Sequence, residues 1–324
     1  MYKNFIVFTP NRLDKFLAEN LSESRNQIEQ LIKKGFVKVD GKVSSKTGLK
    51  LKEDQEILVE FPQVIPKEVK VKEDLKDIDV EIIYEDDEIL VINKPYNLTV
   101  HDAPSVKDAT LVDWLKQKNI SLSTISGDER HGIVHRLDKG TSGVMVVAKT
   151  NEAHVHLAKQ LEVKSMGRYY LAIIDMPLKD NLIVEKPIGR NPNNRLKMAI
   201  VQNARYAKSA FSKLIFSKDE KYELISCKLF TGRTHQIRVH LSSINRHILG
   251  DNLYGFKGEL NKINRFYLHA YILYLTHPKT KKQMSFRANL APDMHEFLCK
   301  NFNMEIVNDK IDKTNIFDSF NFTS

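Results

Sequence analysis

Between residues 11 and 34 the apolar side chains recur every three or four positions, which predicts two short helices. The first apolar face is Leu13, Phe16, Leu17 and Leu21, and the second is Ile28, Leu31 and Ile32. Ser24 followed by Gln27 matches a capping box before the second helix, and Gly35 suits the position after its end. Residues 36–43 then predict a hairpin, because Asp40-Gly41 between extended segments favours a type I′ turn.

Residues 62–79 have a different pattern, with two prolines, alternating charge and little apolar periodicity, which is typical of a linker. We therefore expect a small domain at residues 11–62, a linker at 63–79 and a larger domain at 80–300. The tail at 301–324 is expected to be loosely ordered.

The larger domain is predicted to be α+β. A hairpin is expected from residues 80–84 and 89–93, and a buried strand from residues 144–148. Asn151 is expected to cap a helix, and strands are expected at 168–174, 207–216 and 222–230. Because these strands alternate irregularly with helices and include hairpins, we expect a mixed, largely antiparallel sheet with helices on its faces.

Composition narrows the class of protein without naming a function. The chain has 324 residues, 42% of them hydrophobic, which is enough for a globular core. Fifty Lys and Arg against 41 Asp and Glu give a formal charge of +9, which attracts polyanions. On this ground a ribosome-bound protein, a membrane-surface protein and an RNA-modifying enzyme all remain open.

The cysteines and the hydropathy of the chain indicate the cellular compartment in which the protein works. Cys227 and Cys299 lie far apart and lack the spacing of metal ligands, so neither a zinc site nor a disulfide framework is predicted. The apolar run at the start is too short for a secretory signal, and no stretch approaches the length of a membrane span. We expect a protein of the reducing cytoplasm that does not bind a membrane.

The candidate chemistry is concentrated in residues 130–143. Gly140 and Gly143 permit a tight backbone, and Thr141 and Ser142 can bond that backbone locally, so Asp138 is presented from a loop of defined shape. Taken alone, Asp138 would be an ordinary turn aspartate.

Taken whole, the motif is specific. The run His135-Arg136-Leu137-Asp138-x-x-Thr141-Ser142-Gly143 resembles the signature of the RluA-type family of RNA pseudouridine synthases, which includes the RluD-type enzymes. The resemblance implies the pseudouridine synthase fold and makes Asp138 the catalytic residue. The step Asn93-Lys94-Pro95 recurs in the same family, where it supports the site from beside it.

Two further segments extend the resemblance. Arg168-Tyr169-Tyr170-Leu171-Ala172 is similar to the family's basic-x-Tyr-x-Ala strand, which implies that Tyr170 is the active-site tyrosine and that Tyr169 faces the opposite side. Gly232-Arg233-Thr234-His235-Gln236-Ile237-Arg238 is similar to the segment whose second arginine pairs with the catalytic aspartate, which implies this role for Arg238.

The local pattern around Arg238 also predicts a helix. Thr234 can cap it, and Ile237, Leu241 and Ile244 form one apolar stripe. His235 and Arg238 then fall on the far side, where a cation is free to face a cleft.

RNA contacts are expected from both domains. The small domain resembles the alpha-L RNA-binding domain of a ribosomal small-subunit protein, although Lys52-Glu53-Asp54 replaces the Gly that often precedes the aspartate there. In the family, the arginine matching Arg136 fills the space left by the flipped uridine, and His135 is a supporting neighbour. The candidate RNA-binding residues are Arg136, His135, Lys139, Arg190, Arg195, Lys197, Arg25, Lys33 and Lys34.

The resemblance implies an isomerase that converts uridine to pseudouridine in structured RNA, with 23S ribosomal RNA or a ribosome precursor as the expected partner. The reaction needs no redox cofactor, nucleotide or metal, and a monomer is expected. A non-catalytic RNA-binding or ribosome-assembly factor on the same fold is the main alternative. A metal-dependent nuclease is disfavoured because no acidic cluster accompanies the basic motifs.

Overall fold

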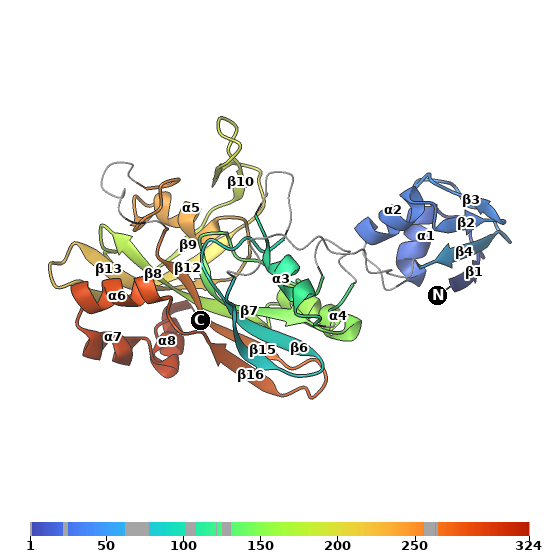
Figure 1. Ribbon diagram of the computed structural model, residues 1–324. Coiled ribbons are helices and arrows are strands. Elements are labelled where there is room, and N and C mark those ends of the chain that lie inside the picture. The colour runs from blue at the N-terminus through green and yellow to red at the C-terminus, as the bar shows by residue number, and fades with distance from the viewer. Residues whose placement is uncertain are drawn as a thin grey trace. The chain divides into compact units, whose positions relative to one another are not determined.

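The computed structural model describes residues 2–21, 25–61, 78–101, 108–120, 122–124, 131–255, 263 and 265–323. The chain divides into two compact units: Met1–Val71 with Thr124–His131, and Lys72–Ser123 with Gly132–Ser324 (Figure 1). Ser24 of the expected capping box, residues 63–77 of the expected linker and the side chain of Arg25 lie outside the described part of the chain.

The small unit packs two helices on one sheet. Its elements are β1 (Tyr2–Ile6), α1 (Leu13–Asn20), α2 (Arg25–Lys33), β2 (Val37–Val39), β3 (Lys42–Val43) and β4 (Glu56–Glu60). The sheet has the order β1-β4-β2-β3. Leu13 and Leu17 of α1 and Ile28 and Ile32 of α2 are fully buried in one core, so the two apolar faces predicted from the sequence are confirmed.

The turns of the small unit also follow the predicted chemistry. The amides of Gly35 and Phe36 donate to the carbonyls of Ile32 and Leu31, which ends α2 as a Schellman motif does. Asp40 and Gly41 both have positive φ, 49° and 73°, as a type I′ turn requires. Strands β1 and β4 were not predicted. Four of the five residues of β1 are exposed and show no buried alternation, whereas β4 buries the alternate residues Ile57 and Val59.

The large unit is built on a ten-stranded sheet. The strands begin with β5 (Glu81–Glu85), β6 (Ile89–Lys94), β7 (Ser142–Ala148), β8 (Gly167–Asp175) and β9 (Leu182–Glu185). They continue with β12 (Lys208–Phe216), β13 (Tyr222–Leu229), β14 (His247–Ile248), β15 (Leu268–Thr276) and β16 (Gln283–Arg287). The order is β5-β6-β7-β15-β8-β13-β12-β9, with β14 paired to β8 and β16 to β15.

The pairing confirms the predicted mixed, largely antiparallel sheet. Strands β7 and β15 run parallel, through His269 beside Ser142 and Ala270 beside Gly143, whereas the other pairs of this sheet are antiparallel. A separate hairpin, β10 (Ile188–Arg190) with β11 (Met198–Ile200), carries the basic loop. The parallel contact matters for the site, because β7 directly follows the loop of Asp138.

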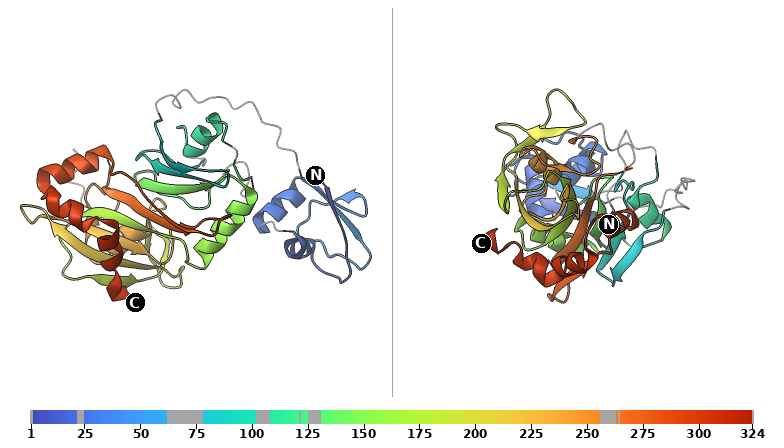
Figure 2. Two further views of the ribbon diagram at one scale, coloured as in Figure 1. Left: turned by 90° about the horizontal axis from the view of Figure 1, so that it is seen from below. Right: turned by 90° about the vertical axis from the view of Figure 1, so that its left-hand side faces the viewer.

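Helices cover both faces of the sheet. Residues of α3 (Leu111–Gln117) and α4 (Asn151–Glu162) belong to the same apolar cluster as Tyr170 and Ala172 of β8. On the other face, Tyr169 and Leu171 pack with α6 (Pro292–Asn301), α7 (Met304–Lys310) and α8 (Lys313–Asp318) (Figure 2). Adjacent residues of a strand point to opposite faces, so the predicted separation of Tyr169 from Tyr170 is confirmed.

The C-terminal tail corrects one expectation. Residues 301–324 were expected to be loosely ordered, but they form α7, α8 and a 3₁₀ turn at Asn321–Thr323. Val307, Ile316 and Phe320 are buried, and the Phe320 ring lies 5.3 Å from the ring of Tyr169. The tail is ordered because it packs on an apolar face of the sheet. The tail sequence alone does not show that this face exists.

The start of α4 is a smaller correction. Asn151 was expected to be its N-cap, but Asn151 is the first helical residue and Thr150 is the cap. The Thr150 hydroxyl accepts a hydrogen bond from the amide of Ala153 at 3.0 Å, which satisfies one of the free amides of the first turn.

The turn between β5 and β6 is held by one carboxylate. Asp86 accepts hydrogen bonds from the Tyr84 hydroxyl at 2.7 Å and from the amides of Glu88 and Ile89 at 2.8 and 2.9 Å, and His277 contacts it at 2.8 Å. Burial acts to raise the pKa of Asp86, but these hydrogen bonds together lower it to about 2. The ionised carboxylate therefore stabilises the folded state.

We predict that Asp86→Ala lowers the free energy of unfolding by about 1–3 kcal/mol at pH 7, through lost hydrogen bonds to a charged group. Because the folded-state pKa lies below the ordinary value of 3.8, the difference from wild type persists above pH 4 and shrinks as the pH falls toward 2. Urea unfolding followed by the fluorescence of Trp114, the single tryptophan, measures it. Asp87→Ala, an exposed neighbour, is the control, and equal losses in the two variants would contradict the prediction.

Candidate active site

The loop that carries Asp138 is fixed by close backbone approaches. The Thr141 amide donates to the Asp138 carbonyl at 3.0 Å and closes the turn. Gly143 has φ 115°, and a Cβ there would lie 2.1 Å from the carbonyl oxygen of Ala270, where β7 and β15 meet. A Cβ at Gly140 would lie 2.6 Å from the ring of Phe266. Both glycines are therefore needed for the packing of the loop.

A buried lysine also holds the loop of Asp138, through hydrogen bonds to backbone carbonyls. Lys94 is fully buried, and its Nζ donates to the carbonyls of Pro95, Leu98 and Lys139 at 2.7, 2.9 and 3.4 Å. Burial lowers the pKa of Lys94 to about 7, and the nearby Asp138 carboxylate opposes this effect. Lys94 thus ties the end of β6 to the residue after Asp138.

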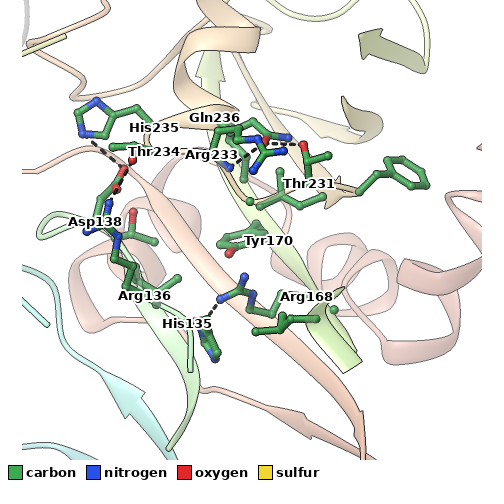
Figure 3. A pocket seen from close by; sticks show the side chains of 18 of the residues that line it. His135, Arg136, Asp138, Arg168, Tyr170, Thr231, Arg233, Thr234, His235 and Gln236 are labelled. Carbon is green, nitrogen blue, oxygen red and sulfur yellow. Dashed lines mark hydrogen bonds and ion pairs between the residues drawn. The ribbon is translucent and has the colours of Figure 1, made fainter. Parts of the chain in front are cut away.

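Asp138, Tyr170 and Arg238 line one cavity of about 340 Å³ within the large unit. This volume lies in the range of small-molecule binding sites, about 300–1,000 Å³. Figure 3 shows the Tyr170 ring inside the cavity, between Asp138 on one side and Arg168 on the other. The three residues predicted to form the site therefore converge, although they come from a loop, from β8 and from α5 (Gln236–Ser242).

Arg238 has two carboxylate partners, of which only Asp138 was anticipated. Its Nη1 lies 3.5 Å from Oδ2 of Asp138, whereas its Nε and Nη2 donate to Asp251 at 2.7 and 2.9 Å. The guanidinium also lies over the ring of Phe266, at 4.2 Å from the centroid. Burial opposes the charge, but the hydrogen bond and the attraction of Asp251, followed by Asp138, raise the pKa of Arg238. The cation is thus permanent.

The helix of Arg238 differs from its prediction at the N-cap. Its N-cap is His235, with φ 57° and no side-chain cap, whereas Thr234 was expected. Arg238 was expected to face a cleft, and it lines the cavity together with His235, with its own side chain 6% exposed. Ile237 and Leu241 are buried as predicted. Sequence periodicity separated the apolar positions from the polar positions but did not show how deeply the Arg238 side chain is buried.

His235 also faces the aspartate. Its Nε2 lies 4.0 Å from Oδ2 of Asp138, and its Nδ1 lies 2.8 Å from the hydroxyl of Tyr254. Burial lowers the pKa of His235, with Asp138 acting in the opposite direction and Arg238 in the same one. At neutral pH the imidazole is therefore uncharged and polar, beside the only carboxylate among the described residues that line the cavity.

Tyr170 stands in a second group with Arg168 and His135. The guanidinium of Arg168 lies 5.9 Å from the centroid of the Tyr170 ring and contacts Nδ1 of His135 (Figure 3). Burial raises the pKa of Tyr170, so its hydroxyl keeps its proton at neutral pH. His135 is buried, and burial followed by the Arg168 charge lowers its pKa, which makes it neutral. His135 therefore supports the cavity wall and is not an exposed RNA contact.

The cavity is strongly cationic. Among the described residues, its lining includes five basic side chains, against the single carboxylate of Asp138: Arg136, Lys164, Arg168, Arg233 and Arg238. Arg136 is exposed, and its Nη2 donates to the Thr234 hydroxyl at 3.1 Å, which holds it at the cavity beside Asp138. Such a lining suits an anionic ligand whose negative charges contact the surrounding cations while an uncharged part of the ligand lies next to Asp138.

The other predicted RNA-binding residues lie outside the cavity. Lys139 pairs with Asp108 at 3.1 Å and remains half exposed. Arg190, Arg195 and Lys197 belong to the β10–β11 hairpin, where Arg190 donates to the Arg195 carbonyl.

In the small unit, Lys33 pairs with Glu29 at 3.1 Å and is more than half exposed, and Lys34 is also exposed. Both lysines are therefore accessible on the surface of the small unit.

Sequence reasoning missed Asp251 and Tyr254. Both belong to the run Gly250-Asp251-Asn252-Leu253-Tyr254-Gly255, in which two glycines bracket an acid and an aromatic residue. That glycine pair marks a tight turn, but it does not show that the turn contacts Arg238 and His235.

Among the residues that the structure describes, no group of three or more His, Cys, Asp or Glu is arranged to hold a metal ion. Within the same part of the chain, no helix is both long and apolar enough to cross a membrane.

Comparison with known proteins gives two domain matches. Residues 88–243 match the family model described as RNA pseudouridylate synthase, and residues 11–57 match the S4 domain. Among solved structures, "Human RNA Pseudouridylate Synthase Domain Containing 4" aligns with a TM-score of 0.53 and 25% identity, covering 68% of this chain and 92% of that one.

Similarity extends over nearly the whole chain. An "Uncharacterized RNA pseudouridine synthase" of Helicobacter pylori (strain ATCC 700392 / 26695) is 49% identical and covers 99% of both chains. The "Ribosomal large subunit pseudouridine synthase D" of Zymomonas mobilis is 38% identical, over 87% of this chain and 91% of that protein. The chain therefore belongs to the RNA pseudouridine synthase family, enzymes that isomerise uridine in RNA, and carries an S4 domain at its N-terminal end.

Proposed function

We propose that Asp138 is the catalytic residue and that the substrate is a uridine of large-subunit ribosomal RNA. The observation that carries the catalytic role is the position of this carboxylate, the only one among the described residues that line the cavity, 3.5 Å from the buried Arg238 and in a cavity shared with Tyr170. A carboxylate held in this way is oriented and within reach of a ligand.

The reaction breaks the bond between C1′ of the ribose and N1 of uracil and forms a bond between C1′ and C5. The proton on C5 is lost, and N1 gains one, so no oxidant or water is consumed. An anionic Asp138 assists by forming a covalent or ion-pair intermediate with the substrate, which divides one difficult step into two. Arg238 supports this role because its guanidinium holds the carboxylate in a fixed orientation.

Access to the base requires that the uridine leave its stack, at a cost of a few kcal/mol. The buried Tyr170 ring offers a face for the extracted uracil, and stacking on an aromatic ring is worth about 1–3 kcal/mol per base. Arg136, exposed beside the cavity, is suited to fill the vacated space in the RNA. Because Tyr170 stays protonated, its hydroxyl acts as a hydrogen-bond donor and not as a ready base.

The ribosomal target is supported by the relative and by the charge. The Zymomonas protein named for the large ribosomal subunit shares 38% identity over most of both chains. The S4 domain and the surplus of nine positive charges favour a large, structured polyanion. The cavity is lined by residues of one unit, so the enzyme is proposed to act as a monomer, in the cytoplasm where ribosomal RNA is made.

We predict that Asp138→Asn lowers turnover by at least about 10⁴-fold, because the amide cannot serve as the anionic group. RNA binding should change by less than about threefold, since the cations that contact phosphate remain. Tritium release from 23S transcripts labelled with [5-³H]uridine measures turnover, and filter binding measures affinity.

Asp219→Asn is the matched control, because Asp219 is an acid of the β12–β13 turn that does not line the cavity. Turnover by Asp138→Asn at the wild-type rate would refute the catalytic role. Loss of turnover together with loss of RNA binding would point to misfolding and is checked by circular dichroism.

For Tyr170 we predict that the contribution of the ring to activity can be measured apart from that of the hydroxyl. Tyr170→Phe keeps the stacking face and should retain measurable turnover, whereas Tyr170→Leu should lose a further ten- to hundredfold in kcat/KM, in line with about 1–3 kcal/mol of stacking. The same tritium assay compares the two variants. Equal activity of the Phe and Leu variants would remove the stacking role.

The proposed target gives a direct prediction in cells. Total RNA from cells that lack this protein should lose pseudouridine at one or more positions of 23S ribosomal RNA, and the wild-type gene but not Asp138→Asn should restore them. Chemical mapping of pseudouridine across all RNA measures this. Losses confined to transfer RNA would overturn the ribosomal target while leaving the catalytic role intact.

A further inference from the structure

The turn Gly250–Gly255 contacts the active site through Asp251. This carboxylate is 1% exposed, and its Oδ1 accepts hydrogen bonds from the amides of Leu253 and Tyr254 at 3.0 and 3.1 Å. Both of its oxygens also accept from Arg238, at 2.7 and 2.9 Å. The turn therefore fixes the carboxylate, and the carboxylate fixes two of the three guanidinium nitrogens. The third, Nη1, is left to face Asp138.

The same turn contacts the site a second time through Tyr254. The Tyr254 oxygen accepts a hydrogen bond from the Met198 amide at 2.7 Å, so its own proton is free to be donated to Nδ1 of His235 at 2.8 Å. A neutral imidazole that accepts at Nδ1 carries its proton on Nε2. Nε2 is the atom that lies 4.0 Å from Oδ2 of Asp138, so an N–H group faces the carboxylate.

These contacts share one geometry. Arg238 and His235 approach the same oxygen of Asp138, and each is held from behind by a residue of one six-residue turn. Supporting residues of this kind set the orientation and tautomer of the groups that act on a substrate. The Asp138 side chain is 26% exposed, so its own burial does not fix it.

We propose that Gly250–Gly255 is a positioning element for Asp138, with Asp251 orienting Arg238 and Tyr254 setting the tautomer of His235. Asp251 and Tyr254 are positioning residues, because they act through Arg238 and His235 and do not line the cavity. This inference rests on the proposed catalytic role of Asp138. It also assigns His235 a direct role, with its Nε2–H group facing the catalytic carboxylate at 4.0 Å beside Arg238.

The first test is Tyr254→Phe, which removes one hydroxyl and keeps the ring that covers Arg238 at 4.9 Å. We expect kcat on the labelled 23S transcript to fall about tenfold, the effect of one lost hydrogen bond, with KM within twofold of wild type. Because an unfolded fraction would also lower the apparent kcat at an unchanged KM, circular dichroism measures the folded fraction of each variant and kcat is expressed per folded enzyme.

The second readout is spectroscopic. In full-length protein labelled with ¹⁵N-histidine, the His235 ring should show protonated Nε2 and unprotonated Nδ1, with the signals assigned from His235→Gln. In Tyr254→Phe the two nitrogens should shift toward a mixture of tautomers, because the donor to Nδ1 is gone. Tyr84→Phe is the control, since it also removes a hydroxyl that donates to a carboxylate, that of Asp86, away from the cavity.

Asp251→Asn tests the other arm. The amide can accept from only one of the two guanidinium nitrogens, and its NH₂ group faces a cation, so Arg238 loses its fixed orientation. We expect kcat to fall about 100-fold, with binding of the 23S transcript within threefold of wild type. Asp86→Asn is the matched control for an aspartate that accepts several hydrogen bonds outside the cavity.

The outcomes are separable from those of the proposed function. If Asp138→Asn is inactive while Tyr254→Phe keeps both the wild-type kcat and the wild-type His235 signals, the positioning role is overturned and the catalytic role stands. If Asp138→Asn turns over normally, the catalytic role itself fails. Should Asp251→Asn prove unfolded by circular dichroism, Tyr254→Phe alone still decides between these results.

Discussion

The site depends on one buried guanidinium. A charge in the interior is costly unless it is paired and hydrogen-bonded, and Arg238 meets this condition through the two-pronged contact with Asp251 and through the ring of Phe266. Asp251 binds two of the three guanidinium nitrogens, and the third, Nη1, faces Asp138. The remaining features of the site, including the fixed loop and the cationic cavity wall, lie around this contact.

The sheet supplies the frame in which this contact forms. Strand β8 is central, with β15 on one side and β13 on the other, so Tyr170 on one of its faces is held against motion. The parallel contact of β7 with β15 brings Gly143 against Ala270 and sets where the loop of Asp138 can emerge. Helices α7 and α8 cover the opposite face, which explains why a polar-looking tail is part of the fold.

The charged residues fall into two groups, those that line the cavity and those on the surface outside it. Among the described residues that line the cavity, cations surround a single carboxylate, and each of Arg238 and Arg168 lies against an aromatic ring. Outside the cavity, the outer cations of the large unit are those of the β10–β11 hairpin, and the small unit has exposed cations of its own. In the proposed function the outer cations bind phosphate, and the inner groups hold one uridine against Asp138.

The sequence by itself determined the local elements and the named chemistry. Apolar spacing predicted α1, α2 and the buried strand β7, Asp40-Gly41 predicted its turn, and the motifs singled out Asp138, Tyr170 and Arg238, which the structure places in one cavity. The elements and the turn depend on neighbouring residues, whose periodicity is visible in the chain. The three site residues were identified by the resemblance of their motifs to those of a known family.

Only the tertiary structure decided that Asp251 and Tyr254 stand behind Arg238 and His235, that β15 lies parallel to β7, and that the tail is helical. Each of these depends on which distant segments meet, and that is set by strand register and by burial of shared apolar faces, not by spacing along the chain.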